Sequence, residues 1–235
     1  MPSKEELRER LHAAKQAKNS ADDAIKALVD LKVPEQARAD KKKLLTRLRR
    51  LSRRMAKRIP ILRRRIEAKR KSGAQKAVRA ARKHVGVTES PAGSNKGPYP
   101  ISASQIHCIG YDGVAWCGCE VCELAVIIGG ADIPLKARLA YTPYIDQDAG
   151  NGANGLTEVS VFHALPGDIA VFNFGSGYAK HTGLVVGPTE NGYVHCIEGN
   201  TSSGTSGSQD NGGGVYERKR PVSDVICIAR PDYQG

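Results

Sequence analysis

The segment PGDIAVFNFGSGYAKHTGLVVGPTENGYVHCIE, residues 166–198, indicates how the C-terminal part of this chain folds. It contains three short runs rich in β-branched and aromatic residues, which are separated by Gly, Pro, Ser and Asn. A fourth run of the same kind follows further along the chain. The four runs are Ile169–Phe174, Thr182–Val186, Tyr193–Ile197 and Val225–Ala229. Short strands joined by turns in this way predict an antiparallel sheet.

Helical patterns precede these runs. Residues 116–128 place their apolar side chains on one helical face, and Gly129 follows as a natural stop. Residues 74–85, AQKAVRAARKHV, form another amphipathic pattern. Helices followed by strands predict an α+β domain, in which the antiparallel sheet packs on helices. We place this domain at residues 75–235.

The net charge of the chain is unevenly distributed. Residues 1–85 hold 28 Lys and Arg against 9 Asp and Glu, or +19, whereas residues 86–235 hold 8 against 15, or −7. A basic half joined to an acidic half predicts two modules with different partners. The basic half is expected to attract polyanions such as anionic wall polymers, an anionic membrane surface or nucleic acid.

The basic half is predicted to begin with two helices. Residues 3–31 repeat apolar side chains at helical spacing, and Ser3 with Glu6 forms a capping box at the start. A second basic helix is expected from about Pro34 to Ile59. A short turn between two amphipathic helices predicts an antiparallel helical hairpin.

Pro60 is expected to break or kink the second helix, because proline cannot donate the helical hydrogen bond. A third basic helical segment is then predicted at residues 61–71, ending at Gly73. We assign residues 1–72 to a basic helical module of hairpin or coiled-coil type. Its role is open between an electrostatic anchor and a structural element through which the chain forms an oligomer.

Cys117 is the candidate nucleophile. It stands at the predicted start of the helix over residues 116–128. A thiol at a helix N-terminus lies beside unpaired backbone N–H groups and the positive end of the helix dipole. Both favour the thiolate, which is the nucleophilic form of cysteine. The neighbouring backbone amide is also suitably placed to bind an oxyanion.

His181 and Glu198 are predicted to lie together on neighbouring strands. If residues 188–191 form a four-residue loop, opposed residue numbers sum to 379, and 181 plus 198 equals 379. A carboxylate at that position would orient the imidazole. A tight turn at Asn191-Gly192 would shift the register and remove this pairing. Asn200 lies two residues beyond Glu198 on the same face.

An ordered set of motifs carries a family resemblance. The set comprises Trp-Cys at 116–117, Pro-Gly-Asp at 166–168, Lys-His-Thr-Gly-Leu-Val-Val-Gly at 180–187 and Ile-Glu-Gly-Asn-Thr-Ser at 197–202. Together these motifs, over about residues 75–235, resemble the CHAP family. CHAP domains are cysteine- and histidine-dependent amidohydrolases/peptidases with a papain-like fold. They cut peptidoglycan, often as parts of bacteriophage endolysins.

The resemblance implies a role for each matching residue. Cys117 is the expected nucleophile, His181 the general base and then acid, and Glu198 the residue that orients it. Asn200 is expected to assist, although a Gly-Asn pair is also common in turns. The implied bonds are muramoyl-L-alanine amides or peptide bonds of the stem or cross-bridge. Nothing in the sequence distinguishes amidase from endopeptidase.

Three further residues are candidates for substrate binding. Trp116, Asn95 and Tyr178 are expected to line or border a substrate groove, although Trp116 could equally pack in the interior. We expect no cofactor and no metal. Some CHAP lysins carry an acidic calcium-binding loop before the nucleophile, but here Asp112 is the only acid of that stretch.

The cysteines allow two interpretations. Cys108, Cys117, Cys119 and Cys122 could form a zinc site, but the chain contains no second Cys-x-x-Cys pair. The alternative is that they fill the core as small apolar residues, as we expect for the cysteines outside the candidate site. These are Cys119, Cys122, Cys196 and Cys227.

The N-terminus, MPSKEELRER, lacks the apolar core of a signal peptide, and no stretch reaches the length of a membrane span. For a bacteriolytic enzyme we therefore expect synthesis in a host cytoplasm and action at the cell wall, after release through a holin pore or carriage in a virion. The alternative function is a polyanion-binding protein whose cysteine domain is catalytically degenerate. A specific nucleic-acid partner is not expected, since residues 86–235 are acidic and residues 199–235 lack interleaved aromatic and basic residues.

Overall fold

The computed structural model describes residues 2–204 and 206–234 of the chain. It divides into two compact units, residues 1–69 and residues 70–235. The division falls inside one long helix, three residues before the end of the basic module expected from the sequence. That helix contributes its first part to one unit and its last part to the other, and each unit is described separately below.

Unit 1 begins with helix α1, Lys4–Asp30. The predicted capping box is present, since the Glu6 amide donates to Ser3 Oγ at 3.0 Å and the Ser3 amide donates to Glu6 Oε2 at 2.7 Å. These two bonds satisfy backbone donors that a helix start otherwise leaves unpaired. The predicted first helix is confirmed.

Helix α2, Arg38–His84, follows the short 3-10 helix η1, Glu35–Ala37. It runs through Pro60 without interruption, so the predicted break at Pro60 was wrong. Pro60 is exposed, which leaves the carbonyl four residues earlier free to bond to water. Apolar packing on the far side of Pro60 also favours continuation, because Leu62 lies in the unit's core.

The predicted end of the helix at Gly73 was also wrong. A Cβ placed on Gly73 would lie 2.5 Å from the Gly129 carbonyl oxygen and 2.8 Å from the Tyr233 Cβ. Gly73 therefore serves close packing inside unit 2 rather than helix termination. The segment predicted as a separate helix at residues 74–85 is the last part of α2.

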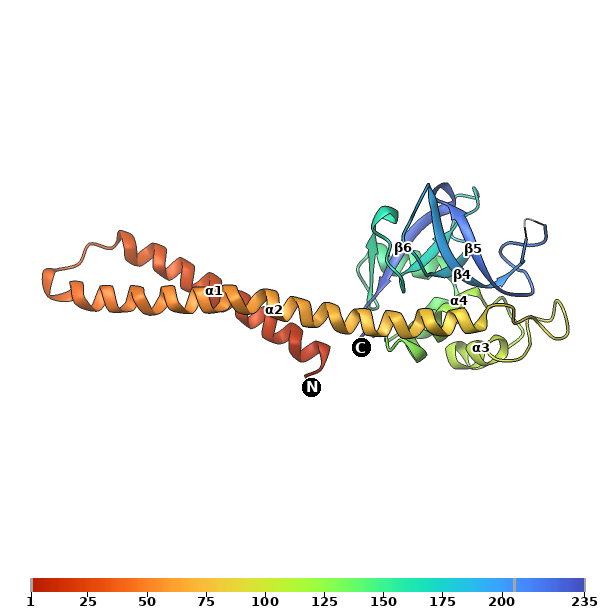
Figure 1. The fold of residues 1–235 in the computed structure, drawn as a ribbon, viewed down its shortest axis with the longest axis horizontal. Coiled ribbons are helices and arrows are strands. Elements are labelled where there is room, and N and C mark those ends of the chain that lie inside the picture. Colours follow the sequence, from red (N-terminus) through yellow and green to blue (C-terminus); the bar gives the residue numbers. More distant parts are fainter. Residues whose placement is uncertain (1, 205, 235) are drawn as a thin grey trace. The chain divides into compact units, whose positions relative to one another are not determined.

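The two helices of unit 1 pack as an antiparallel hairpin (Figure 1). Leu7, near the start of α1, shares a small core with Leu62 of α2. Further along α1, Asp22 Oδ1 accepts a hydrogen bond from Ser52 Oγ at 2.6 Å. Residue numbers thus rise along α1 as they fall along α2, in agreement with the predicted hairpin.

Unit 2 supplies further helices before its sheet, together with the end of α2. They are α3 (Ile101–Ile109), α4 (Cys117–Cys122), the π-helical segment η2 (Glu123–Ile128), the 3-10 helix η3 (Lys136–Ala140) and α5 (Thr142–Gly150). The single helix predicted at residues 116–128 is therefore an α-helical turn that passes directly into a π-helical one.

The sheet of unit 2 has six antiparallel strands in the order β1-β6-β2-β3-β4-β5. The strands are β1 (Leu156–Val159), β2 (Ile169–Phe172), β3 (His181–Val185), β4 (Tyr193–Thr201), β5 (Gly214–Pro221) and β6 (Val225–Pro231). Two short 3-10 helices, η4 (Val161–His163) and η5 (Val222–Asp224), lie in the connections. The predicted α+β class and antiparallel sheet are confirmed.

Apolar side chains cover both faces of this sheet. Leu184 and Ile197 belong to a large cluster that includes the helices and the end of α2, which lie beneath the sheet in Figure 1. Phe172, Val185 and Cys196 belong to a second, smaller cluster. Alternation along each strand assigns the two clusters to opposite faces. Among the described residues, no helix combines the length and apolar content that crossing a bilayer requires.

Candidate active site

Cys117 is the first residue of α4, and Trp116 occupies the N-cap position immediately before it. No side chain caps the helix start, and the first intrahelical bond runs from the Glu120 amide to the Trp116 carbonyl at 2.9 Å. The backbone N–H groups of the first turn, next to Cys117, therefore have no acceptor within the helix. Because α4 continues into η2, their dipole is that of a longer helical segment.

Close backbone contacts hold the start of α4. A Cβ on Gly118 would lie 2.0 Å from the Leu139 carbonyl oxygen, so only glycine fits beside the nucleophile candidate. A Cβ on Gly199 of β4 would lie 2.4 Å from the Trp116 ring. The close approach of η3 therefore explains the glycine that follows Cys117.

His181 and Glu198 meet in the interior of unit 2. His181 Nε2 lies 3.1 Å from Glu198 Oε2, and both residues are fully buried. Cys117 is also buried, with 5 % of its surface exposed. The predicted association of His181 with Glu198 is therefore present.

The strand register that led to this association was nevertheless wrong. Leu184 pairs with Ile197, so opposed numbers sum to 381 rather than 379, and the tight turn at Asn191-Gly192 is formed. The shift is two residues, which keeps His181 and Glu198 on one face because side chains alternate with period two. Glu198 thus reaches His181 diagonally.

Gly183 makes room for that diagonal contact. A Cβ on Gly183 would lie 2.4 Å from the Glu198 Cγ. The Glu198 side chain therefore crosses β3 at the one position where no side chain blocks it, and continues toward His181. The glycine in the motif His-Thr-Gly-Leu consequently has a packing role in the site.

Arg220 of β5 is a site residue that the sequence analysis missed. Its Nε donates to Glu198 Oε1 at 2.9 Å and its Nη2 donates to Glu198 Oε2 at 2.6 Å, in the two-pronged geometry typical of Arg and carboxylate. Arg220 is itself 6 % exposed. Glu198 therefore bridges the imidazole and a buried guanidinium. No local pattern distinguishes Arg220 from Arg218 in the run ERKR.

Two aromatic rings lie beside His181 and Arg220. Phe172 and Phe174 stack on the His181 imidazole with ring centroids 6.2 and 5.9 Å away. The Arg220 guanidinium carbon lies 5.0 Å from the centroid of the Phe174 ring, within cation–π range. The rings of Phe172 and Phe174 therefore form part of the buried, apolar surroundings of the imidazole.

The surroundings of His181 raise its pKa. Burial alone opposes the charged imidazolium, but the negative charge and hydrogen bonding of Cys117, together with Glu198, outweigh burial and raise the pKa to about 9. Nδ1 is buried and makes no hydrogen bond of good geometry to a described residue. Since Nε2 faces Glu198, Nδ1 is the nitrogen left to exchange a proton with Cys117.

Glu198 stays ionised despite complete burial. Burial by itself would raise its pKa, but hydrogen bonds with His181 and Arg220 hold the pKa below its ordinary value. The site thus contains a buried carboxylate, a guanidinium and an imidazole that readily takes a proton. Such an imidazole is suited to exchange a proton with a neighbouring nucleophile or leaving group.

Asn200 is buried at the same end of β4, but its contacts differ from the expected role beside the imidazole. With its amide oriented to satisfy both ends, Oδ1 accepts from the Trp116 amide at 3.2 Å and Nδ2 donates to the Gly212 carbonyl at 2.7 Å. Asn200 therefore ties β4 to the residue immediately before Cys117. It positions the start of α4.

The three predicted substrate-binding residues lie in different environments. Trp116 is fully buried and its Nε1 donates to Glu89 Oε1 at 3.0 Å, so the expected groove position was wrong and the packing alternative holds. Asn95 is half-buried, and its carbonyl accepts from the Gln105 side chain at 2.7 Å. Tyr178 is exposed on the β2–β3 loop, which also carries Phe174.

A second buried His–Glu pair connects α4 to α2. His84, at the end of α2, lies with its Nδ1 2.8 Å from Glu120 Oε1. Burial raises the pKa of Glu120, and the bond to His84 opposes that effect. This pair was not anticipated, because it links residues that are far apart in the sequence. It joins the helix that carries Cys117 to the end of α2.

The other cysteines are free thiols buried in the core, as expected for Cys119, Cys122, Cys196 and Cys227. Cys108 belongs to the same large cluster as Cys119 and Cys122. Over residues 2–204 and 206–234, no group of three or more His, Cys, Asp or Glu side chains is arranged to hold a metal ion.

Comparison with protein-family models, with curated proteins and with solved structures found no match for this chain.

Proposed function

We propose that this protein is a peptidoglycan hydrolase of the phage-lysin type, which cleaves an amide bond by cysteine nucleophilic catalysis. The observation that carries the proposal is the buried chain of groups from Cys117 through His181 to Glu198. A thiol, an imidazole and a carboxylate in this order are the parts that acyl transfer to water requires. A papain-like CHAP architecture for residues 70–235 is part of the same proposal.

Acylation follows from these groups. The Cys117 sulfur attacks the amide carbonyl carbon, a carbon–sulfur bond forms, and the carbonyl electrons move to oxygen. N–H groups of the first turn of α4 stabilise this oxyanion. When the intermediate collapses, the carbon–nitrogen bond breaks and the leaving amine takes the proton from His181 Nδ1.

Deacylation reverses the roles. His181, now neutral, accepts a proton from water, and the resulting hydroxide attacks the thioester carbon. The carbon–sulfur bond breaks, the carboxylic acid product leaves, and Cys117 and His181 return to their starting state. Glu198, held by Arg220, keeps the imidazole oriented with Nδ1 toward the sulfur throughout.

The choice of peptidoglycan as substrate is supported by the ordered motifs that resemble the CHAP family, at Cys117, His181 and the run 197–202. The implied bonds are muramoyl-L-alanine amides, stem peptides and cross-bridges. Action at the cell wall is part of this proposal.

The experiment that tests the proposal is digestion of purified peptidoglycan by the wild type and by Cys117→Ala, with mass spectrometry of the released fragments. Cys227→Ala is the matched control, because it removes a buried thiol on β6 outside the site. We expect fragments from the wild type and the control, and none from Cys117→Ala. The new chain ends would identify an amidase or an endopeptidase, whereas equal release by Cys117→Ala would exclude the mechanism.

A polyanion-binding protein with a degenerate cysteine domain is the second candidate function. The observation that favours it is the charge of α2, in which 21 Lys and Arg stand against two acids between Arg38 and His84. If the wild type releases no fragments from several wall types, while the chain binds polyanions as tightly as Cys117→Ala does, this candidate takes first place.

A further inference from the structure

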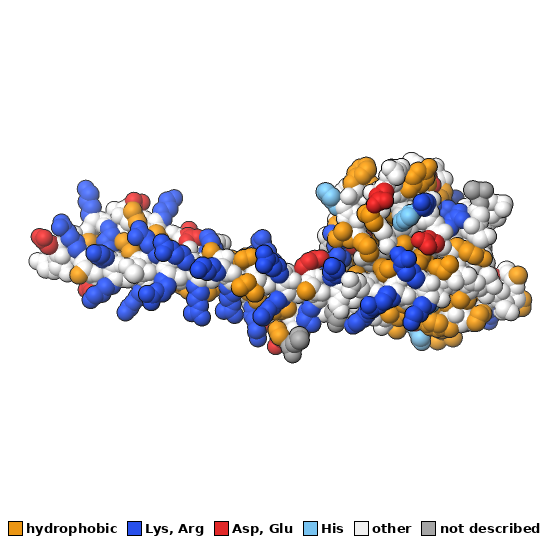
Figure 2. Space-filling view, viewed as in Figure 1, with side chains coloured by type: hydrophobic (Ala, Val, Ile, Leu, Met, Phe, Trp, Pro, Cys, Tyr) orange, Lys and Arg blue, Asp and Glu red, His pale blue; other side chains and the backbone are white. Residues whose placement is uncertain are grey.

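The turn end of the helical hairpin, residues 29–54, combines exposed apolar side chains with a high positive charge. Its Lys and Arg number ten against three acids, or +7. Figure 2 shows Lys and Arg side chains crowded over the N-terminal helices, with apolar side chains between them. Four large apolar residues of this end are exposed, namely Val29 51 %, Leu31 52 %, Leu44 44 % and Leu51 39 %.

Leu44 and Leu51 continue the stripe that forms the hairpin core. They are followed on α2 by Met55 and Leu62 at steps of four and seven residues, which repeat on one helical face. Met55 and Leu62 are covered by α1, at 7 % and 4 % exposure. The stripe is therefore complete along α2, but α1 covers only the part away from the turn.

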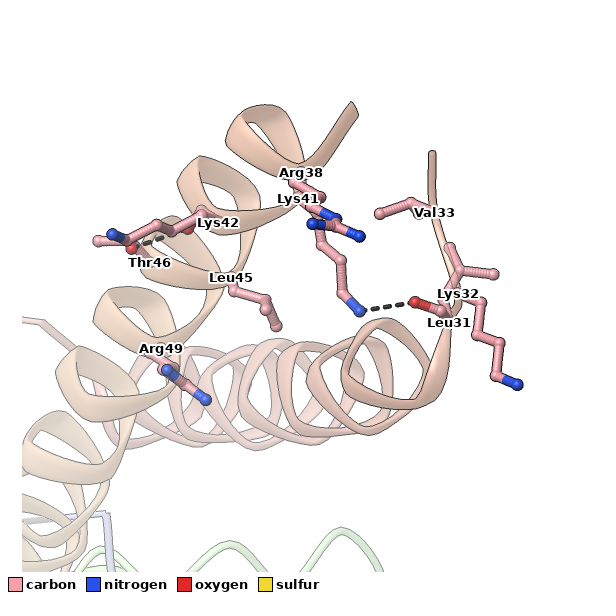
Figure 3. A pocket seen from close by; sticks show the side chains of 9 residues that line it. All are labelled: Leu31, Lys32, Val33, Arg38, Lys41, Lys42, Leu45, Thr46 and Arg49. Atoms are coloured by element: carbon pink, nitrogen blue, oxygen red, sulfur yellow. Dashed lines mark hydrogen bonds between the residues drawn. The ribbon is translucent and has the colours of Figure 1, made fainter. Parts of the chain in front are cut away.

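A cleft of about 670 Å³ lies at this end between α2 and the connection at residues 31–33 that follows α1 (Figure 3). Lys41 Nζ joins α2 to the end of α1 by donating to the Leu31 carbonyl at 2.6 Å and to the Val29 carbonyl at 3.1 Å. Those carbonyls belong to the end of α1, where a cation is favourable. Leu31 and Leu45 supply apolar lining.

The other cations around the cleft are not used by the fold. Among the residues that the structure describes, Lys32, Lys42 and Arg49 make no ion pair, and Arg38 makes only an exposed contact to Glu35 at 3.7 Å. Cations without ion-pair partners beside the apolar side chains of Leu31, Val33 and Leu45 suit a ligand that is anionic at one end and apolar at the other.

We propose that the turn end of the hairpin is a docking surface for a bilayer rich in anionic phospholipids. Lys32, Lys42 and Arg49 contact lipid phosphates, while Leu31 and Leu44 enter the boundary between headgroups and acyl chains. The helices lie on the surface, since no described helix is apolar enough to span. This inference does not depend on the proposed hydrolysis.

Other partners fit these observations less well. A phosphate-rich wall polymer would satisfy the cations and leave the four apolar side chains in water. Single-stranded nucleic acid is usually held by stacking, and residues 1–69 contain no Phe, Tyr or Trp. A second copy of the hairpin would bring two ends of +7 together, which repel each other.

Co-sedimentation of the full chain with lipid vesicles tests the proposal. The probes are vesicles of phosphatidylcholine alone and vesicles with one third phosphatidylglycerol. We expect strong binding only to the anionic vesicles. The double variant Leu31→Ser/Leu44→Ser keeps every charge and should bind about tenfold more weakly, because the apolar insertion is lost. Ile61→Ser, an equally exposed apolar residue away from the turn end, is the matched control and should bind normally.

A charge pair of variants completes the test. Lys42→Gln/Arg49→Gln should weaken binding about tenfold, whereas Lys15→Gln/Arg63→Gln removes the same charge away from the turn end and should weaken it less than threefold. Circular dichroism checks that each variant stays helical. The proposal is overturned if the leucine variant binds as the wild type does, because binding would then be electrostatic alone, as expected for a wall polymer. Absence of binding to either vesicle also overturns it.

Discussion

At the scale of single residues, the candidate site depends on how each buried charge is compensated. Glu198 is placed between His181 and Arg220, so that one carboxylate serves an imidazole and a guanidinium at once. Gly183 permits this arrangement because the Glu198 side chain crosses the backbone there, and Gly199 makes room for the Trp116 ring beside Cys117. The chemistry therefore depends on two small residues as well as on the charged ones.

The pKa of His181 leads to a prediction about pH. The proposed reaction needs the imidazolium to protonate the leaving amine, and the folded-state pKa is about 9. We expect kcat/KM for peptidoglycan to be constant through neutral pH and to fall as pH rises through about 9. An activity maximum near pH 6, with loss already at pH 8, would contradict the raised pKa.

The same shift predicts how stability depends on pH. Because the folded pKa exceeds the unfolded value of about 6.5, the stabilising contribution of His181 is fully present below that value and is lost as pH rises through 9. Cys117→Ala removes the largest favourable influence on the imidazolium. Urea unfolding between pH 6 and 10 should therefore show a smaller alkaline loss of stability in Cys117→Ala than in the wild type.

Arg220 is predicted to act as a positioning residue through Glu198. Arg220→Gln leaves a buried carboxylate with one partner fewer, which should cost about 3–5 kcal/mol of stability in chemical unfolding. It should also raise the pKa of Glu198, so that the acid limb of activity moves to higher pH. Arg218→Gln is the control on the same strand. A purely structural role for Arg220 would lower stability and leave the pH profile unchanged.

At the scale of elements, α2 behaves as one helix although its sequence carries two apparent stops. Pro60 is tolerated because it is exposed and because Leu62 beyond it packs on α1. Gly73 is retained because α2 approaches Gly129 and Tyr233 closely there. Tertiary packing thus overrides local helix-breaking preferences at both positions.

Pro60→Ala should therefore stabilise the hairpin. Proline in a helix interior is about 3 kcal/mol less favourable than alanine, and no described contact of Pro60 offsets that cost. We expect a gain of about 1–3 kcal/mol in the helical unfolding transition, followed by circular dichroism. Thr46→Ala, at another exposed position of α2, should gain less than about 1 kcal/mol. A loss of stability in Pro60→Ala would show that the proline shapes the helix favourably.

At the scale of the whole molecule, the structural division changes the distribution of charge. Residues 1–69 hold 22 bases and 9 acids, or +13, and residues 70–235 hold 14 bases and 15 acids, or −1. The last part of α2 adds six bases to a unit that otherwise carries −7. The second unit is therefore nearly neutral, and the attraction to polyanions that the sequence predicts is expected of the first unit.

This separation predicts different responses to salt. Attraction between the hairpin and any polyanionic surface is screened as ionic strength rises, whereas the site chemistry is buried. Sedimentation with intact cell walls should fall steeply between 50 and 500 mM NaCl (about a tenfold range in salt). Cleavage of small soluble wall fragments should change by less than about twofold over that range. If added salt reduced cell-wall binding and fragment cleavage equally, the site itself would recognise charge.

Features that depend on short-range rules could be predicted from the order of the amino acids. The capping box at Ser3, the helical and strand periods, and the α+β class follow from spacing along the chain. The shared face of His181 and Glu198 also follows, because alternation survives a register shift of two residues. The charged strand β5 was missed, since its exposed side chains hide the alternation.

Which side chains contact one another depends on the three-dimensional packing and could not be predicted. The register of β3 on β4 depends on the turn at Asn191-Gly192 and on irregular pairing near it, and these are set by packing rather than by pattern. The contacts of Arg220 with Glu198, and of His84 with Glu120, join residues 22 and 36 positions apart. Such contacts form because burying a charge is favourable only with a partner in reach, and the fold alone brings that partner there.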